Sequence, residues 1–391
     1  MSDLRGAYID LAAIRDNVKV LQDLAKNSEV MAVVKADAYG HGLIPVAKAA
    51  RQGGATWLGT ALLEEAIHLR KSGDKGRILT WLGSPKDKWQ ECIDLDIDVS
   101  VSSIEIASAI IDGAKKSGKT ANVHIKVDTG LGRNGVMPND LADLTNVLEE
   151  AKAAGQINVV AVWTHFALAD APSSPTIAKQ LEVLDQSFKF VESRGFKNLM
   201  KHAANSAATL TAPNAHFDLV RPGIAVYGIT PGGEVGKASE YGLRPAMSLK
   251  ANAALVKDVP AGHGISYGAE YVTKTDTKIA LIPLGYADGV PRIAGNKGPV
   301  LANGKKFNVA GRVCMDQFVI DIGDLDFSTG DEVVLFGDPA KNEPDVEEWA
   351  KASQSIGYEI VTRLGPRVPR IYLNEIYESL LYFSKHHHLK C

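Results

Sequence analysis

Cysteine is scarce in this sequence of 391 residues, which contains only Cys92, Cys314 and Cys391. The three are far apart and form no CxxC pair, so the sequence argues against a disulfide framework and against a cysteine-rich zinc site. Unpaired cysteines are typical of a reducing compartment. We therefore expect a cytoplasmic protein.

Long apolar runs and dense basic stretches are also missing. Every apolar stretch is interrupted well before the roughly eighteen residues that a membrane span requires, and charges are scattered through the N-terminal segment. The 43 Lys+Arg and 46 Asp+Glu residues give a net charge of only −3. We therefore expect no membrane segment, no signal peptide and no nucleic-acid partner, which leaves small molecules as the default ligands.

The chain is long for a single hydrophobic core. Hydrophobic residues make up 45% and charged residues 23% of its 391 residues, as in an ordinary globular protein. One core rarely serves a chain of this length, so we predict two domains. A change in sequence pattern divides the chain into residues 1–237 and residues 238–391.

Strand-like and helix-like segments alternate in residues 1–237. This alternation predicts an α/β fold, specifically a (β/α)8 barrel of TIM type, which typically needs ~250 residues. A doubly wound open sheet is the alternative. Amphipathic segments of helical period cover 62–73, 102–118, 139–155 and 177–195. The eight short apolar runs lie at 30–35, 57–61, 78–83, 98–102, 123–128, 159–166, 199–205 and 217–223.

Two further features complete the fold prediction. Polar and charged residues follow the apolar runs at their C-terminal ends, which in a barrel converge on the face that carries the active site. Residues 238–391 instead contain short strand-like runs broken by Gly, Pro and Asn, such as MSLKANAALVKDV and KIALIPLGYADG. We therefore predict a barrel followed by a mainly β domain.

The most informative motif is VVKADAYGHG, which covers residues 33–42 and ends the first apolar run. Lys35 closes the predicted strand. Partial desolvation lowers the pKa of a lysine, and a neutral amine attacks a carbonyl to form an imine. Lys35 is thus a candidate imine-forming residue, although many strand-end lysines only lead their charge into solvent.

This motif resembles the cofactor-lysine signature of the bacterial alanine racemases, whose barrel domain binds pyridoxal 5′-phosphate (PLP). The resemblance extends through nearly the whole chain. It implies a PLP-dependent isomerase that interconverts L-alanine and D-alanine and supplies D-alanine for cell-wall peptidoglycan. Such a site needs an anion cradle, a partner for the pyridine nitrogen and acid/base groups on both faces of the substrate Cα.

The seventh and eighth apolar runs end in candidates for the phosphate cradle. HAANS at 202–206 offers backbone N–H groups and a hydroxyl ahead of a helix-like stretch, and RPGI at 221–224 contains a glycine that allows close backbone approach. The resemblance implies that the residues binding PLP are Lys35, Tyr39, Asn205, Ser206, Arg221, Gly223, Ile224 and Tyr358.

The resemblance places the Arg221 guanidinium at the pyridine nitrogen of PLP. Arginine has a pKa above about 12 and does not hand over its proton, so the ring nitrogen stays unprotonated. The cofactor is then a weak electron sink, which favours prompt reprotonation and therefore racemisation over transamination. Outside this family context, Arg221 would be a surface or salt-bridging arginine.

Racemisation by two bases needs one proton acceptor on each face of the substrate. The resemblance assigns one face to Lys35 and the other to Tyr267, within GHGISYG at 262–268. It makes His165 and Arg221 supporting residues that bring the phenol into a useful pKa range. By residue type alone, Tyr267 would be a strand-edge aromatic. In the family this tyrosine comes from the other subunit, which implies a homodimer with two shared sites.

The fifth apolar run continues into KVDTGLGR at 126–133, with a cation at each end. The resemblance places Arg133 near the cofactor's phenolic oxygen and the substrate carboxylate. It matches Lys126 to a lysine that is carbamylated in some members, which converts an ammonium into an anion that fixes Arg133. A tyrosine and a methionine close to Cα would leave room for a methyl group and exclude longer side chains. The remaining substrate residues that the resemblance implies are Tyr286, Met315 and Asp316.

Three alternatives stay open. Another PLP enzyme of this architecture would racemise serine or a basic amino acid, or decarboxylate an amino acid, although decarboxylation favours an acidic partner at the ring nitrogen. A non-catalytic PLP-binding carrier protein would resemble only the barrel half. A metalloenzyme is the weakest alternative. We predict no metal site because no HExxH-like spacing occurs among His41, His124, His165, His202 and His263.

Overall fold

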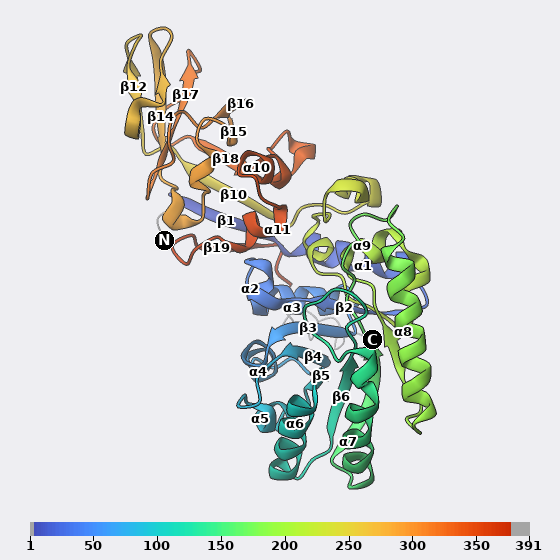
Figure 1. The fold of residues 1–391 in the computed structure, drawn as a ribbon. Helices are drawn as coiled ribbons and strands as arrows, with labels where there is room; N and C mark the ends of the chain where they lie inside the picture. Colours follow the sequence, from blue (N-terminus) through green and yellow to red (C-terminus); the bar gives the residue numbers. More distant parts are fainter. Residues whose placement is uncertain (1–3, 377–391) are drawn as a thin grey trace, which may run out of the picture.

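The structure is a computed structural model that describes residues 4–376, so Cys391 lies outside the described residues. The chain forms a barrel and a β-rich part, which lie end to end in an elongated molecule (Figure 1). The predicted fold class, a barrel of α/β type followed by a mainly β part, is confirmed. Between residues 4 and 376, no helix is both long enough and apolar enough to cross a membrane.

The barrel sheet contains eight parallel strands, in the order β8-β7-β6-β5-β4-β3-β2-β9. Hydrogen bonds between its two end strands close it. The N–H of Asp218 donates to the Lys201 carbonyl at 3.1 Å, and the N–H of Arg221 donates to the Ala204 carbonyl at 2.8 Å. The alternative of an open sheet is therefore wrong. The strands are β2 (Glu29–Val33), β3 (Trp57–Leu62), β4 (Arg77–Leu82), β5 (Asp98–Val101), β6 (Ala121–Lys126), β7 (Ile157–Trp163), β8 (Met200–His202) and β9 (Leu219–Val220).

Helices surround the barrel sheet, and their sequences explain where they start and stop. In α6, for example, the Ser103 hydroxyl accepts the Ile106 N–H at 3.3 Å at the start, and Gly118 ends the helix in the left-handed conformation. The four amphipathic segments correspond to α4, α6, α7 and α8. The helices are α1 (Leu11–Leu24), α3 (Leu43–Gln52), α4 (Leu63–Lys71), α5 (Trp89–Asp94), α6 (Ile104–Ser117), α7 (Leu141–Ala153), α8 (Thr176–Ser193) and α9 (Ser206–Thr211).

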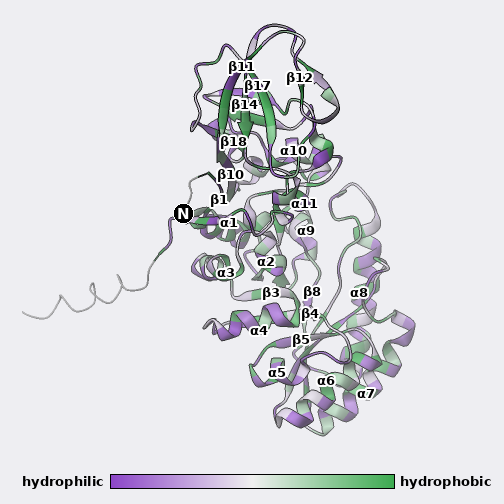
Figure 2. Cartoon of the chain, turned by 90° about the vertical axis from the view of Figure 1, so that its left-hand side faces the viewer, coloured by the Kyte–Doolittle hydropathy of each residue, from purple (hydrophilic) through white to green (hydrophobic). Residues whose placement is uncertain are grey.

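The β-rich part contains three sheets, with the strand orders β16-β15-β18-β10-β1-β19, β11-β14-β17 and β12-β13. Hydrophobic residues follow the strands of the second sheet (Figure 2). The elements are β1 (Arg5–Asp10), β10 (Met247–Asn252), β11 (Leu255–Val259), β12 (Gly264–Ile265), β13 (Tyr271–Val272), β14 (Thr277–Ile282), β15 (Pro299–Ala302), β16 (Lys305–Asn308), β17 (Phe318–Gly323), β18 (Glu332–Phe336), α10 (Val346–Ala352), α11 (Gly357–Thr362) and β19 (Arg370–Leu373).

The first strand of the chain lies in the β-rich part, although the sequence pattern assigned residues 1–237 to the barrel domain. β1 pairs antiparallel with β10 and parallel with β19. Its Ala7 and Ile9 side chains are completely buried there. Pairing between segments some 240 residues apart leaves no local signal in the sequence, because strand pairing depends on the folded chain and not on neighbouring residues.

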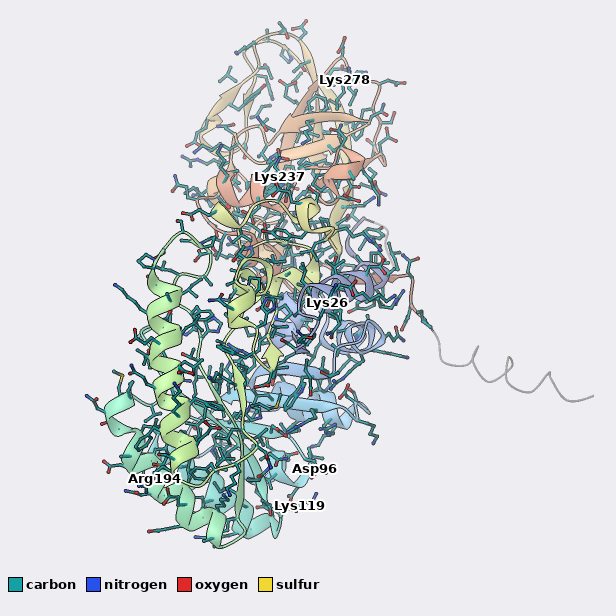
Figure 3. All side chains as sticks on the ribbon, turned by 90° about the vertical axis from the view of Figure 1, so that its right-hand side faces the viewer. Lys26, Asp96, Lys119, Arg194, Lys237 and Lys278 are labelled. Carbon is teal, nitrogen blue, oxygen red and sulfur yellow. The ribbon has the colours of Figure 1, made fainter. Side chains whose placement is uncertain are left out.

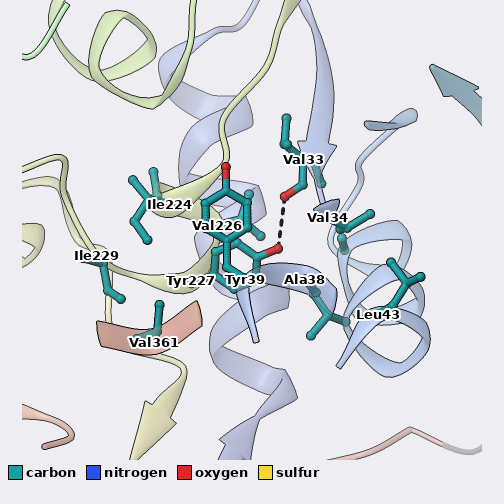
Figure 4. Packing of buried hydrophobic residues seen from close by; sticks show 14 of the residues in the cluster. Val33, Val34, Ala38, Tyr39, Leu43, Ile224, Val226, Tyr227, Ile229 and Val361 are labelled. Carbon is teal, nitrogen blue, oxygen red and sulfur yellow. Dashed lines mark hydrogen bonds between the residues drawn. The ribbon is translucent and has the colours of Figure 1, made fainter. Parts of the chain in front are cut away.

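The two parts share one continuous core. Tyr39 follows the first barrel strand and packs beside Ile224 and Tyr227, and Val361 of α11 closes this cluster from the β-rich part (Figure 4). The buried Tyr227 hydroxyl donates a hydrogen bond to the Val33 carbonyl at 3.0 Å, so this polar group is satisfied within the core. The barrel face that carries polar strand ends is thereby fixed to α11.

The segment α2 (Lys35–Tyr39) is a left-handed turn. Four consecutive residues within it, Ala36 to Tyr39, have φ between 53° and 54°, a conformation that costs an ordinary residue roughly 1–2 kcal/mol. Two carboxylates stabilise the turn. Glu65 accepts the Ala36 N–H at 2.6 Å, and Asp37 accepts the Leu43 N–H at 2.7 Å. Such strain is typical of positions where function dictates the backbone.

Gly40 ends this turn with φ of 79°, and an added Cβ would lie 2.4 Å from the Val361 carbonyl oxygen. We expect Gly40→Ala to lower the free energy of unfolding by about 3 kcal/mol, through backbone strain and overpacking together. Gly118 is the matched control, because its φ is 70° and no atom lies within 4 Å of an added Cβ. Gly118→Ala should lower the free energy of unfolding by only about 1 kcal/mol. Both variants are measured by urea titration. Equal losses would contradict the packing of α2 against α11.

Candidate active site

A cavity of about 360 Å³ lies at the C-terminal ends of the barrel strands. This is the face on which the sequence predicted the site. Four side chains in its lining are cationic, and no lining residue is a carboxylate. The lining residues are Val33, Lys35, Ala36, Tyr39, Trp81, Lys126, Arg133, Trp163, His165, Asn205, Ser206, Arg221, Gly223, Ile224, Tyr358 and Thr362.

Lys35 enters the cavity directly after β2, as the first residue of the left-handed turn. Burial lowers the pKa of its amine, and the nearby Arg133 lowers it further, while Glu65 acts in the opposite direction. A lowered pKa increases the fraction of neutral amine, which is the form that attacks a carbonyl. Lys35 therefore has the environment of a reactive lysine.

One end of the cavity is a small cradle of backbone and hydroxyl groups. The Ser206 hydroxyl accepts the N–H of Gly223 at 2.8 Å and the N–H of Ala225 at 3.2 Å. Asn205 caps α9 by accepting the Ala208 N–H at 3.1 Å. A Cβ at position 223 would lie 2.3 Å from the Tyr39 hydroxyl oxygen, so only glycine lets the chain come this close to the phenol.

Two tyrosines form the wall of this cradle. The Tyr39 ring lies 6.2 Å from the Tyr358 ring and 4.9 Å from the Tyr227 ring, measured between centroids. Burial raises the pKa of both Tyr39 and Tyr358, so both phenols stay protonated at neutral pH and are able to donate hydrogen bonds. Tyr358 belongs to α11, so the β-rich part contributes directly to this cavity.

The middle of the cavity holds two cations over one indole. The Lys126 amine lies 4.6 Å, and the Arg221 guanidinium carbon 4.7 Å, from the centroid of Trp163. These are cation–π distances. Burial lowers the pKa of Lys126 to about 7, with Arg133 and Arg221 contributing in the same direction. At neutral pH the amine is therefore present in both its charged and its neutral form.

The loop after β6 positions Arg133. The Asp128 carboxylate accepts the N–H groups of Gly130, Leu131 and Gly132 at 2.9, 3.0 and 3.1 Å, which folds the loop around the carboxylate. Partial burial acts to raise the pKa of Asp128, but these backbone donors outweigh it and lower the pKa. Arg133 follows this turn and reaches the cavity.

His165 and Arg221 are two further titratable groups of the lining, and Arg221 is only 4% exposed. Burial lowers the pKa of His165 well below its usual value, and Arg221 and Arg133 add to the effect, so the imidazole is neutral at pH 7. The Arg221 guanidinium donates to the carbonyls of Thr164 at 2.7 Å and Ala203 at 3.0 Å. Burial lowers the pKa of Arg221 to about 9, so it remains charged.

The other predicted residues lie outside this cavity, on the β-rich part. Tyr267 stands in a short turn and is 72% exposed. Tyr286 and Met315 belong to adjoining loops, and both side chains are exposed. The Tyr286 N–H donates to the Cys314 carbonyl at 3.0 Å, which joins the two loops. Asp316 accepts from Arg367 at 2.7 Å. Within one chain, these four residues do not meet Lys35.

Sequence reasoning missed several lining residues. Trp81 and Trp163 were not named, yet Trp81 is the next-to-last residue of β4 and Trp163 the last residue of β7, so the rule that strand ends carry the site would have found them. Thr362 had no such signal, because α11 reaches the barrel only through the packing of the two parts. Glu65 was also missed, since a helix glutamate that bonds the Ala36 N–H looks like any surface acid in the sequence.

Comparison with known proteins agrees with the resemblance in both parts of the chain. Residues 9–231 match the family model described as alanine racemase, N-terminal domain, and residues 246–372 match alanine racemase, C-terminal domain. The alanine racemase of Streptomyces coelicolor is 50% identical over 374 residues, covering 94% of this chain and 96% of that protein.

Solved structures agree as well. The crystal structure of alanine racemase from D-cycloserine-producing Streptomyces lavendulae is 50% identical, with a TM-score of 0.95 over 99% of this chain and 100% of that one. An alanine racemase of Clostridium difficile 630 is 36% identical, with a TM-score of 0.89 over 96% of this chain and 97% of that one. This chain therefore belongs to the alanine racemase family and is an isomerase of that type.

Proposed function

We propose that this enzyme holds PLP on Lys35 and interconverts L-alanine and D-alanine by two-base proton transfer, with Lys35 and Tyr267 as the bases. The proposal includes a cytoplasmic location and the supply of D-alanine for peptidoglycan. The observation that carries it is the cavity, which joins a lysine of lowered pKa to a hydroxyl-lined cradle and three further cations. This set suits a carbonyl compound with a phosphate and a substrate with a carboxylate.

The donor set fits PLP at both ends. The cradle of Ser206, Gly223 and Ile224, with the phenols of Tyr39 and Tyr358, offers hydroxyl and backbone donors to a phosphate, and Asn205 fixes the start of the adjoining helix. Arg221 would face the ring nitrogen at the other end. Its guanidinium stays charged at neutral pH, so it keeps its proton, as the racemisation argument requires.

PLP, when bound, withdraws electrons from the substrate Cα and makes its hydrogen acidic. Lys35 then holds or removes the proton on one face, and its lowered pKa increases the fraction of neutral amine that is able to accept a proton. We assign the other face to Tyr267. A neutral His165 beside Arg221 offers that phenol a hydrogen-bond partner, which is how these two residues would support it.

The substrate carboxylate and methyl group have separate partners in this proposal. Arg133 and Lys126 provide positive charge, or a carbamate on Lys126 provides an anion that holds Arg133. Tyr286, Met315 and Asp316 would close the pocket around the methyl group. Residues 1–237 thus carry the cofactor and one base, and residues 238–391 carry the other. Because Tyr267, Tyr286 and Met315 are exposed and do not line the cavity of their own chain, we propose that they complete the site of a second copy in a homodimer.

The cofactor assignment is tested by borohydride reduction of the PLP-loaded protein, followed by peptide mapping. We expect one pyridoxyl group, on Lys35, because Lys35 begins the turn whose last residue, Tyr39, reaches the cradle beside Gly223. Lys126 is the matched control, since its amine lines the same cavity and its pKa is also lowered. Lys126→Ala should keep the label and Lys35→Ala should lose it. A label on Lys126 would overturn the assignment.

The shared site is tested by mixing two inactive variants. In the proposed dimer, each site takes Lys35 from one subunit and Tyr267 from the other. Lys35→Ala and Tyr267→Phe should each lower turnover of L-alanine at least about a hundredfold, the usual contribution of a general base. Unfolded together and refolded as a mixture, they should recover roughly a quarter of wild-type activity, because half of randomly paired dimers carry one intact site. Recovery no greater than the sum of the separate variants would refute sharing.

The state of Lys126 is tested with ¹³C-bicarbonate. A carbamate forms only on a neutral amine, and the pKa of Lys126 is lowered to about 7. We therefore expect a carbamate ¹³C resonance that is strong near pH ~8 and declines as the pH falls through ~7, where the amine is protonated. Lys201→Ala should keep the resonance, since the Lys201 amine lies outside the cavity and pairs with Asp185 at 2.9 Å. Persistence of the resonance in Lys126→Ala would contradict the assignment.

A further inference from the structure

A chain of hydrogen bonds runs through the barrel interior behind Arg221. Its Nη1 atom lies 3.0 Å from Nδ1 of His202, whose Nε2 atom lies 3.0 Å from Nδ1 of His124. The Nε2 atom of His124 lies 3.0 Å from Oδ2 of Asp98. Asp98 begins β5 and His202 ends β8, so the chain leads from the N-terminal ends of the barrel strands to the face that carries the cavity.

The direction of every bond in this chain is fixed by its ends. A guanidinium only donates and a carboxylate only accepts. Arg221 therefore donates to Nδ1 of His202, which leaves the His202 proton on Nε2 for donation to His124. His124 in turn carries its proton on Nε2 and donates it to Asp98. Both imidazoles are consequently held as the same tautomer, with Nε2 protonated and Nδ1 accepting.

This chain of hydrogen bonds is isolated from solvent. His124 and His202 are completely buried, and Asp98 is only 2% exposed. Trp163 stacks on His202 at 5.3 Å and an interplanar angle of 14°, and Trp57 meets His124 edge-on at 5.5 Å. Burial lowers the pKa of both histidines, so both are neutral at pH 7. Hydrogen bonds in such a dry environment are stronger and polarise one another.

The charges of the chain lie at opposite ends. Among residues 4–376, no carboxylate oxygen comes within 4.0 Å of the Arg221 guanidinium, although Arg221 is only 4% exposed. The anion nearest along the chain is Asp98, two imidazoles away. Arg77, whose side chain is 45% exposed, pairs with Asp98 from the surface and lies over the Trp57 ring at 4.0 Å. The chain thus joins a buried cation to a carboxylate near the surface.

We propose that Asp98 is a positioning residue for the reaction, which acts on Arg221 through His124 and His202. The carboxylate polarises both imidazoles, and Nδ1 of His202 becomes a stronger acceptor for the Arg221 N–H. The guanidinium is thereby held in one orientation, while its Nη2 group donates to the backbone carbonyls of Thr164 and Ala203. This inference rests on the proposed role of Arg221 at the cofactor's ring nitrogen.

The tautomers are measured first, by NMR of the full-length protein labelled with ¹⁵N-histidine, both loaded with PLP and after its removal. We expect His124 and His202 to carry their protons on Nε2 in both samples. A proton on Nδ1 of either ring would overturn the proposal. Failure of PLP to attach to Lys35 would contradict the proposed function but would leave these histidine resonances unchanged. A failure of the proposed function is therefore distinguishable from a failure of this inference.

Asp98→Asn then removes the charge and keeps an oxygen that accepts from His124. The Hε2 resonance of His124 should move upfield, and that of His202 should follow, because the weakened polarisation passes along the chain. Turnover should fall about fivefold to tenfold while PLP binding is kept, as expected when a charge-assisted bond becomes a neutral one.

Asp96→Asn is the matched control, since Asp96 is 81% exposed and lies at the molecular surface near Lys119 (Figure 3). A purely local role would move the His124 resonance alone and leave turnover at the wild-type value, which would overturn the proposal.

A second variant keeps the proposal testable if Asp98→Asn does not fold. Arg77→Gln alters a half-exposed side chain and removes the cation that competes for the Asp98 oxygen. The Asp98 charge then acts more strongly on His124, so the Hε2 resonances of both histidines should move downfield, opposite to their shift in Asp98→Asn. Shifts confined to His124, or shifts of opposite sign in the two rings, would overturn the proposal.

Discussion

The site depends on holding Lys35, Lys126, Arg133 and Arg221 around one cavity whose lining contains no carboxylate. Burial and mutual repulsion both oppose this arrangement. The protein compensates with the face of Trp163 and with backbone carbonyls instead of anions placed in the cavity. The uncompensated part of the cost appears as the lowered pKa values of Lys126 and Arg221. Phosphate and carboxylate groups would relieve it, so the electrostatic cost of the site selects for anionic ligands.

Backbone geometry sets Lys35 apart from the other three basic residues. The left-handed turn after β2 places Lys35 at the cavity while Tyr39, four residues on, reaches the cradle beside Gly223. A right-handed helix starting at Lys35 would direct the residues after it differently, so the strained conformation is what joins lysine and cradle in one segment. Glu65 and the packing of Gly40 on Val361 support the turn from outside. The position of Lys35, and with it the chemistry proposed there, therefore depends on a contact from the β-rich part.

The sequence predicts those features that arise from local pattern. All eight barrel strands and the four amphipathic helices follow from periodicity, and the strand-end rule places Lys35, Lys126 and Arg221 on one face. The pairing of β1 with β10 and β19 was not predictable, since it joins segments from opposite ends of the chain. The same holds for Thr362, which α11 brings to the cavity through tertiary packing. Only the family resemblance pointed to Tyr358 and Tyr267, because neither stands at the end of a barrel strand.

Tyr267, Tyr286 and Met315 pose a physical problem that one chain does not solve. Three large side chains with apolar surface are exposed on one part of the molecule, at 72%, 40% and 53%, although burying such surface is favourable. The loops that carry Tyr286 and Met315 are nevertheless rigidly built. Asp288 is completely buried and bonds the Gly285 N–H at 2.9 Å, and Arg367 bridges it to Asp316. Ordered loops that present exposed aromatic and thioether groups are typical of a surface shaped to contact another surface. The proposed dimer would give that surface its partner, and it would bring the second base to a cavity that already holds the first.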